Sequence, residues 1–257
     1  MLTPAPARTD IPEIVAHRGD AEHFPENSLP GLEAAWRHGL RHAEFDVQLS
    51  ADGVPYVIHD ADLHRTSRST GDLRLMMSGQ LDGVDACEPR RFGARHAGTH
   101  LPRLTAVAEL MKVIPDARAF VELKRASLVH HGRLHCIEHV IAALDGVLDR
   151  CVMISFDAEA CRMVRETAGL RIGWVFEGNP ARHLAALEEL RPEFAFCDHR
   201  ELPAAGTLPA GSWTWAVYEV VDAHLARALH ARGVAMVESM APRTLLAELL
   251  KNGERPP

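Results

Sequence analysis

Short runs of apolar residues alternate with longer segments of helical period along most of the chain. Nine runs have the length and composition of buried strands. They are Ile14–Ala16, Ala43–Val47, Pro55–Ile58, Ala119–Leu123, Val152–Ser155, Ile172–Phe176, Phe194–Cys197, Trp213–Val217 and Val234–Val237. Between them lie helical segments, in which residues such as Leu184, Leu187 and Leu190 recur on one face. Repeated β-then-α units favour a closed (β/α)8 barrel or a doubly wound sheet.

One connection departs from this alternation. After the second strand the chain reads LSADGVPYVIHD, in which residues 51–53 can form a tight turn but leave no room for a helix. We therefore expect an antiparallel β-hairpin there, which explains nine strands rather than eight. No G-x-G-x-x-G follows the first strand, which disfavours a dinucleotide-binding sheet. We predict a single TIM-barrel domain over residues 1–257, with the irregular stretch of about 61–100 as a small insertion over the barrel mouth.

Composition and charge exclude several classes of protein. The hydrophobic content of 47% and charged content of 25% are ordinary for a globular chain. A net charge of −7 argues against a nucleic-acid partner. No transmembrane run or secretory signal is visible, and five widely spaced cysteines without a C-x-x-C pair are typical of reduced thiols. We expect a cytoplasmic protein. The sequence leaves the oligomeric state open, with a homodimer as one alternative.

Polar residues interrupt several strands near their carboxyl ends, where barrel enzymes carry their functional groups. Alternation along a strand places residues two apart on the same face, which applies to the two acidic residues of the second strand. Such groups are costly to bury unless they are paired or bound to a metal. The residues are His17, Arg18, Glu44, Asp46, His59, Asp60, Glu122 and Lys124.

These residue types together indicate phosphoryl chemistry. Three carboxylates without a cysteine pair suit a hard divalent cation, Mg²⁺ or Ca²⁺, better than zinc. Two histidines supply a candidate acid and base, while an arginine and a lysine can hold an anion. Each residue alone also has a structural interpretation, as a hydrogen-bonded histidine or an ion pair. Their joint occurrence at successive strand ends favours hydrolysis of a phosphate ester.

Other polar residues receive no role at this stage. His130, His131 and His135 in HHGRLH have the pattern of a surface loop with an early helical turn. Asp198 and His199 follow the seventh strand, but the sequence offers them no partner, so we expect a solvated loop.

The same residues resemble the glycerophosphodiester phosphodiesterase family. The opening AHRGDAEHFPENSLPGLEAAWRHG is similar to that family's first motif, and AEFDVQLSADGVPYVIHDADLHRTS to its second. THLPRLTAVAEL, FVELK and ISFD resemble later segments, over about residues 14–218. HRG alone is weak evidence. HRG, PEN, E-x-D, HD and E-L-K in that order are specific.

The resemblance implies a site for a small phosphodiester. His17 and His59 would be the acid–base pair. Glu44, Asp46 and Glu122 would bind the divalent metal, and Arg18 and Lys124 the phosphate. Glu26 and Asn27 would support the site, with Asn27 or Ser28 also capping the first helix. Phe156 would contact the substrate, and Trp215 would line the glycerol end or be an ordinary core aromatic.

Two departures from the family pattern fall on the substrate side. Tyr218 stands where the family has an asparagine-like residue, and AMVESMAP replaces an Ile-Thr-Asp-x-Pro ending, with Glu238 inside it. The expected reaction yields sn-glycerol 3-phosphate and an alcohol such as choline or ethanolamine. Two alternatives are a lysophospholipase D-type enzyme acting on lipid diesters and a barrel that binds a phosphorylated metabolite without turnover.

Overall fold

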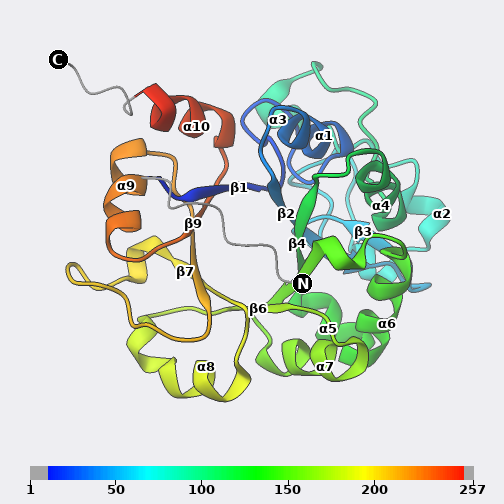
Figure 1. The fold of residues 1–257 in the computed structure, drawn as a ribbon. Helices are drawn as coiled ribbons and strands as arrows, with labels where there is room; N and C mark the ends of the chain where they lie inside the picture. Colours follow the sequence, from blue (N-terminus) through cyan, green and yellow to red (C-terminus); the bar gives the residue numbers. More distant parts are fainter. Residues whose placement is uncertain (1–10, 252–257) are drawn as a thin grey trace.

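The computed structural model describes residues 11–251, in which eight parallel strands close into a barrel. β1 pairs with both β2 and β9, which closes the sheet (Figure 1). This confirms the predicted (β/α)8 barrel. The barrel strands are β1 (Glu13–His17), β2 (His42–Leu49), β4 (Arg118–Leu123), β5 (Cys151–Ser155), β6 (Ile172–Val175), β7 (Phe194–Asp198), β8 (Thr214–Tyr218) and β9 (Met236–Ser239).

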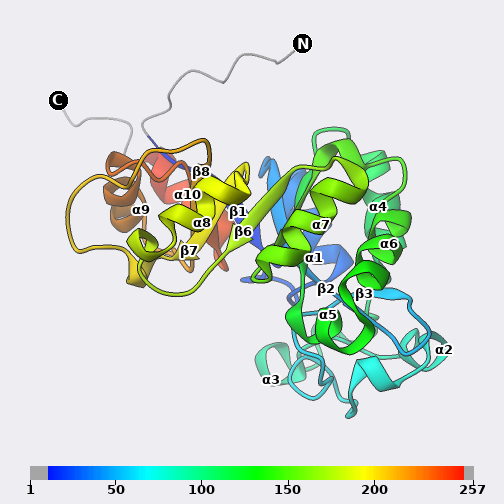
Figure 2. The same ribbon diagram turned by 90° about the horizontal axis from the view of Figure 1, so that it is seen from below.

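Helices surround the barrel on its outside (Figures 1 and 2). Alternate residues of each strand face them, while the other residues fill the barrel with a separate apolar cluster that includes Val15, Phe120, Ile154 and Phe196. The helices are α1 (Leu29–Arg37), α4 (Leu104–Val113), α5 (Arg125–His131), α6 (Arg133–Ala143), α7 (Ala158–Ala168), α8 (Leu184–Leu190), α9 (Ala223–Ala231) and α10 (Pro242–Lys251).

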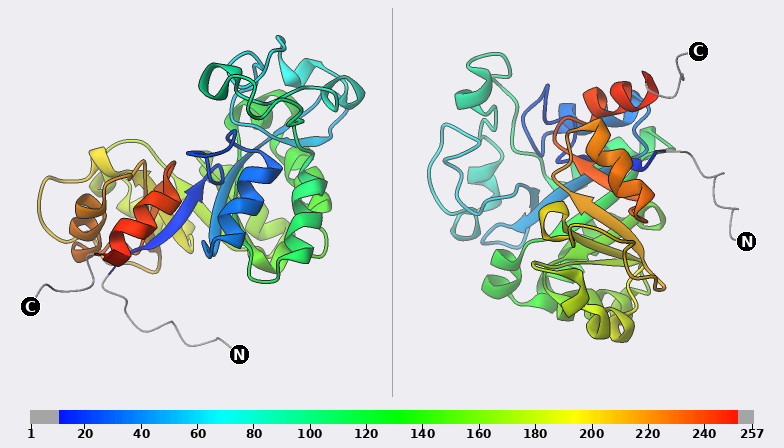
Figure 3. Two further views of the ribbon diagram at one scale, coloured as in Figure 1. Left: turned by 90° about the horizontal axis from the view of Figure 1, so that it is seen from above. Right: turned by 90° about the vertical axis from the view of Figure 1, so that its left-hand side faces the viewer.

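The predicted hairpin is present. β3 (Pro55–Val57) runs antiparallel to β2, and Gly53 in the turn has φ +80°, a conformation that favours glycine. The segment that follows, cyan in Figure 3, forms a lobe next to this hairpin and contains the short helices α2 (Ser78–Leu81) and α3 (Pro89–Phe92). Tyr56 and Leu63 belong to the lobe's own apolar cluster, separate from the barrel core.

Three local expectations from the sequence are wrong. Asp198 is not in a solvated loop, because it ends β7 and its carboxylate accepts hydrogen bonds from Arg200. β9 begins at Met236 rather than Val234, because the Val234 amide still donates to Leu229 O at the end of α9. The HHGRLH segment is not a loop. Its first two histidines end α5, and α6 starts immediately after Gly132, whose φ of +89° separates the two helices.

Residues 1–10 and 252–257 lie outside the described part, so the expectation about a secretory signal, which concerns the first residues, is not addressed by the structure. Within residues 11–251, no helix is both long and apolar enough to cross a membrane.

Ser28 begins α1, and its replacement should destabilise the protein. The Ser28 hydroxyl accepts a hydrogen bond from Gly31 N at 3.2 Å and donates to Pro25 O at 2.6 Å. Ser28→Ala leaves both groups unpaired, so we expect the free energy of unfolding to fall by about 0.5–2 kcal/mol in urea denaturation. Ser212→Ala, at an exposed loop position, is the control. Equal stability of the two variants would contradict this assignment of the cap.

Candidate active site

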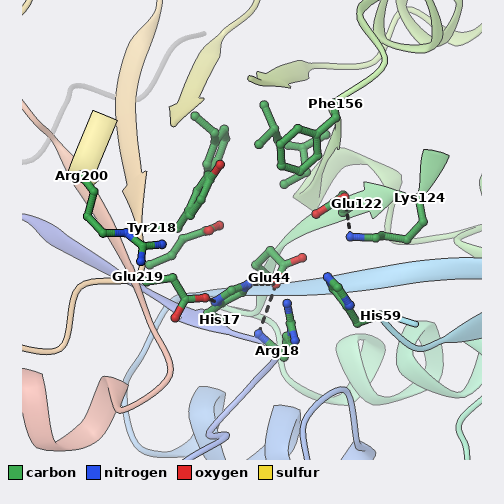
Figure 4. A pocket seen from close by; sticks show the side chains of 14 residues that line it. His17, Arg18, Glu44, His59, Glu122, Lys124, Phe156, Arg200, Tyr218 and Glu219 are labelled. Carbon is green, nitrogen blue, oxygen red and sulfur yellow. Dashed lines mark hydrogen bonds and ion pairs between the residues drawn. The ribbon is translucent and has the colours of Figure 1, made fainter. Parts of the chain in front are cut away.

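The carboxyl ends of the barrel strands surround a pocket of about 330 Å³. Figure 4 shows Glu44 near its centre, between His17 and His59, with Glu122 and Lys124 beside them. The polar residues come from β1, β2, β4, β8 and β9 and from the segments that follow β1, β3, β4, β7 and β8. Apolar side chains of β5, β6 and β7 complete the wall. The lining residues are His17, Arg18, Glu44, His59, Glu122, Lys124, Ile154, Phe156, Val175, Phe196, Arg200, Tyr218, Glu219 and Glu238.

Three buried carboxylates form a group with the spacing of a metal site. Glu44, Asp46 and Glu122 each offer an oxygen, and these oxygens lie within 4.8 Å of one another. Adjacent strands bring them together, because Asp46 of β2 pairs in register with Glu122 of β4. Glu44 Oε1 is buried without a hydrogen-bond partner. An all-oxygen donor set with an unpaired buried oxygen fits Mg²⁺ or Ca²⁺.

Two cations flank this carboxylate group. Lys124 Nζ lies 2.9 Å from Glu122 Oε1 and 3.2 Å from Asp46 Oδ1. Arg18 Nε lies 3.2 Å from Asp46 Oδ2, and the Arg18 backbone amide donates to Glu44 Oε2 at 3.2 Å. Arg18 has φ +58°. This left-handed conformation directs the Arg18 amide toward the Glu44 carboxylate on β2.

Burial and mutual repulsion perturb the carboxyl groups. Burial, with repulsion from Asp46, raises the pKa of Glu44 well above its usual value, and burial raises the pKa of Glu122 to about 7 despite Lys124. Burial acts in the same direction on Asp46, but Lys124 and Arg18 outweigh it and lower its pKa. A bound divalent cation would favour the ionised form of all three groups.

The two histidines lie on either side of Glu44, and each has a carboxylate next to Nδ1. His59 Nδ1 is 2.6 Å from Asp60 Oδ1, and His17 Nδ1 is 3.1 Å from Glu219 Oε1. Burial, together with the charge of Arg18, lowers the pKa of His59. A carboxylate at Nδ1 leaves Nε2 of His59 to exchange protons with a ligand in the pocket, whereas Nε2 of His17 lies 3.7 Å from Glu44 Oε2.

The segment between β1 and α1 supports the carboxylate group from one side. Asn27 Nδ2 donates to Asp46 Oδ2 at 2.8 Å, and Asn27 Oδ1 accepts from Asp46 N at 3.1 Å. Ser28 is therefore the helix cap, whereas Asn27 holds a carboxylate of the site. Glu26 accepts from Arg18 at 3.0 Å and from both terminal nitrogens of Arg65.

Comparison with known proteins identifies the family of this chain. Residues 17–237 match the model of the glycerophosphoryl diester phosphodiesterase family. The chain belongs to this family. Its members are phosphoric diester hydrolases.

Curated relatives of this family share about a third of the aligned residues. A glycerophosphodiester phosphodiesterase of Caldanaerobacter subterraneus subsp. tengcongensis is 30% identical over 167 residues, 64% of this chain and 66% of that protein. A probable glycerophosphodiester phosphodiesterase 1 of Mycobacterium tuberculosis is 31% identical over 185 residues, 68% of this chain and 67% of that protein. The aligned parts thus span about two thirds of the length of these relatives.

Solved structures of the family share the fold along nearly the whole chain. An Oleispira antarctica phosphodiesterase in complex with the product sn-glycerol-3-phosphate has a TM-score of 0.80 at 23% identity, covering 92% of this chain and 96% of that chain. A glycerophosphodiester phosphodiesterase from Agrobacterium tumefaciens has a TM-score of 0.74 at 26% identity, covering 92% and 100%.

Trp215, expected from the family resemblance at the glycerol end, does not line the pocket. Its indole faces outward from β8, where Nε1 donates to Pro209 O and the ring packs near Phe176 and Trp213. The alternation of the strand directs Tyr218, three residues later, inward instead. Trp215 is therefore a packing residue, as the alternative interpretation had it.

Glu219 was missed by the sequence reasoning. It follows the inward-facing Tyr218 and lies beside His17, two hundred residues away in the chain but separated only by β9 in the sheet. The local pattern around Glu219 gives no signal for this pairing. Glu238, by contrast, could be suspected from sequence, because it is an acidic residue inside an apolar strand, and it is buried at the pocket wall.

In the metal-free protein, the contribution of Glu122 to the free energy of unfolding should fall as the pH rises toward 8. Below pH 4.5 both the folded and the unfolded state keep this carboxyl protonated, so its contribution is complete. Between 4.5 and about 7 only the unfolded state ionises, so stability falls, and the contribution is lost above the folded pKa. Melting temperatures in EDTA from pH 5 to 8 should decline more for the wild type than for Glu122→Gln. Parallel profiles would contradict the raised pKa.

Proposed function

We propose that this protein hydrolyses glycerophosphodiesters to sn-glycerol 3-phosphate and an alcohol in a reaction that depends on a divalent metal. The observation that carries the proposal is the convergence of three buried carboxylates, two carboxylate-supported histidines and two cations in one pocket of a family member.

The two cationic side chains and the carboxylate group fit a phosphodiester. Glu44, Asp46 and Glu122 would hold Mg²⁺ or Ca²⁺, which supplies positive charge to a phosphate when bound. Arg18 and Lys124 line the same pocket and would bind the remaining phosphate oxygens, Arg18 through two parallel hydrogen bonds. The phosphate would therefore lie at the centre of the ring of strand ends.

The histidines would move the protons. One of His17 and His59 takes a proton from the attacking hydroxyl, which belongs either to water or to the substrate's own glycerol. In the second case a cyclic phosphate forms, and water must then open it to give sn-glycerol 3-phosphate. The other gives a proton to the departing alcohol. Glu219 and Asp60 support the two roles, since each lies at Nδ1 of one ring and favours the form in which that nitrogen carries a proton.

The pocket favours a small substrate over a lipid diester. A volume of about 330 Å³ is near the lower end for ligand pockets, and ten of the fourteen lining residues are polar or charged. Phe156 lines this pocket and would contact the substrate. A lysophospholipase D-type activity would need room for an acyl chain.

A substrate panel tests this proposal. We expect release of sn-glycerol 3-phosphate from glycerophosphocholine, glycerophosphoethanolamine or glycerophosphoglycerol, and a slower reaction with lysophosphatidylcholine. The assay couples glycerol 3-phosphate from the water-soluble diesters to glycerol-3-phosphate dehydrogenase, and choline from lysophosphatidylcholine to choline oxidase. Faster turnover of the lipid diester would favour the lipid-directed alternative. Tight binding of glycerol 3-phosphate with no turnover of any diester would favour the phosphometabolite-binding barrel.

A further inference from the structure

A second cluster of possible metal ligands lies on α6, outside the pocket. His135 and His139 are four residues apart in this helix, so their side chains extend from the same face. Their ring centroids lie 3.9 Å apart. His135 is exposed and His139 is half-buried, so an ion can reach the pair from solvent.

Both imidazoles direct their Nε2 atoms toward the turn between β2 and β3. A methyl group built on Gly53 would lie 3.1 Å from His135 Nε2 and 3.2 Å from His139 Nε2. Because Gly53 has no side chain, the space between the two nitrogens and the turn stays open. The two potential donor atoms therefore converge on one small volume.

The hydrogen bonding of His139 sets the form of its ring that can bind a metal. Its Nδ1 lies 2.8 Å from His135 O, and a carbonyl oxygen can only accept, so Nδ1 carries the proton. The lone pair of the neutral ring is then on Nε2. A backbone carbonyl at the other ring nitrogen is the support that metal-binding histidines usually have.

We propose that His135 and His139 bind a divalent transition-metal ion, of the class of Cu²⁺, Ni²⁺ and Zn²⁺, through their Nε2 atoms. Imidazole favours these ions over Mg²⁺ and Ca²⁺, so the site is chemically distinct from the carboxylate group in the barrel. Two histidines four residues apart on a helix is the arrangement that many zinc enzymes use for two of their ligands.

The site binds an ion without hydrolytic chemistry of its own. Within residues 11–251, the group of three side chains whose donor atoms lie close enough to share one metal ion is Glu44, Asp46 and Glu122. The histidine pair has no third such side chain in this part of the chain, so water completes the coordination of its ion. His131 is not a ligand. Its Nε2 lies 3.1 Å from Leu49 O, and its ring centroid is 6.1 Å from that of His135. Metal binding joins successive turns of α6 and should stabilise this helix.

Cu²⁺ binding to the full chain without a histidine tag tests the proposal. Mg²⁺ is present in excess, and Cu²⁺ is added as its glycine complex. We expect the tightest Cu²⁺ site to show nitrogen hyperfine coupling from two imidazoles in electron paramagnetic resonance. His135→Ala and His139→Ala should each weaken this site by more than about tenfold, since even an outer support of a metal ligand contributes that much.

His131→Ala is the matched control, with wild-type affinity expected. The double variant should bind one Cu²⁺ fewer per chain and keep its diester hydrolysis. The resonance spectrum of the wild type decides the question even if a variant misfolds. Coordination by oxygen alone, or tight binding retained in the folded double variant, would overturn the proposal.

Discussion

Removal of divalent metal should reduce the hydrolysis of glycerophosphocholine by at least about 10²–10³-fold, and added Mg²⁺ or Ca²⁺ should restore it. The reason is electrostatic: charge that develops on the phosphate oxygens loses its main stabilising partner, and such losses are of this size or larger. The three carboxylates are buried, and Glu44 Oε1 has no hydrogen-bond partner, so that oxygen is available to an ion. The measurement is the initial rate after dialysis against EDTA, with and without each metal.

Variants locate this dependence in the carboxylate group. Glu44→Gln and Glu122→Gln should show a similar loss of rate and need a higher metal concentration for half-maximal activity. Glu13→Gln is the control, because Glu13 begins β1 at the opposite end of the barrel, where it pairs with His42 at 2.7 Å. Full activity after complete metal removal, or Glu122→Gln with an unchanged metal requirement, would contradict the assignment.

His17→Ala and His59→Ala should each lower kcat for glycerophosphocholine by about 10²–10⁴-fold, the range for loss of a general acid or base. Both rings line the pocket, and each is supported by a carboxylate at Nδ1. His42→Ala, far from the pocket on β2, should retain wild-type kcat. If either site variant kept the full rate, that histidine would have no part in proton transfer.

A substrate with a good leaving group separates the two roles. Glycerophospho-p-nitrophenol needs no protonation of its departing oxygen, so the variant that lacks the general acid should recover most of its rate. The variant that lacks the base should remain slow. Recovery of both variants, or of neither, would contradict a division into one acid and one base.

The barrel was predictable because its signal is local. Each strand is a short apolar run, and the turn at Gly53 is too short for a helix, so strand count and hairpin follow from spacing. What failed were boundaries set by hydrogen bonds that no pattern records. Val234 is apolar and β-branched, yet its amide completes the end of α9. A single glycine, Gly132, divides two helices where the sequence suggested a loop.

The carboxylate group was predictable for a related reason. Residues two apart on a strand share a face, and parallel strand ends meet at one rim, so Glu44, Asp46 and Glu122 converge without knowledge of long-range packing. Glu219 is different. Its pairing with His17 depends on the closure of the barrel and on the loop after β8, neither of which is encoded near either residue. The sequence also left undecided which face of β8 points into the pocket. In the structure Tyr218 lines the pocket, whereas Trp215 packs on the outer face of the strand.

A crystal structure of the protein with Ca²⁺ and sn-glycerol 3-phosphate tests the central claim most directly. The account predicts one cation bound by oxygens of Glu44, Asp46 and Glu122, a phosphate oxygen on that cation, and Arg18 and Lys124 in contact with the phosphate. Phosphate bound elsewhere, or a cation that leaves these three carboxylates free, would contradict it.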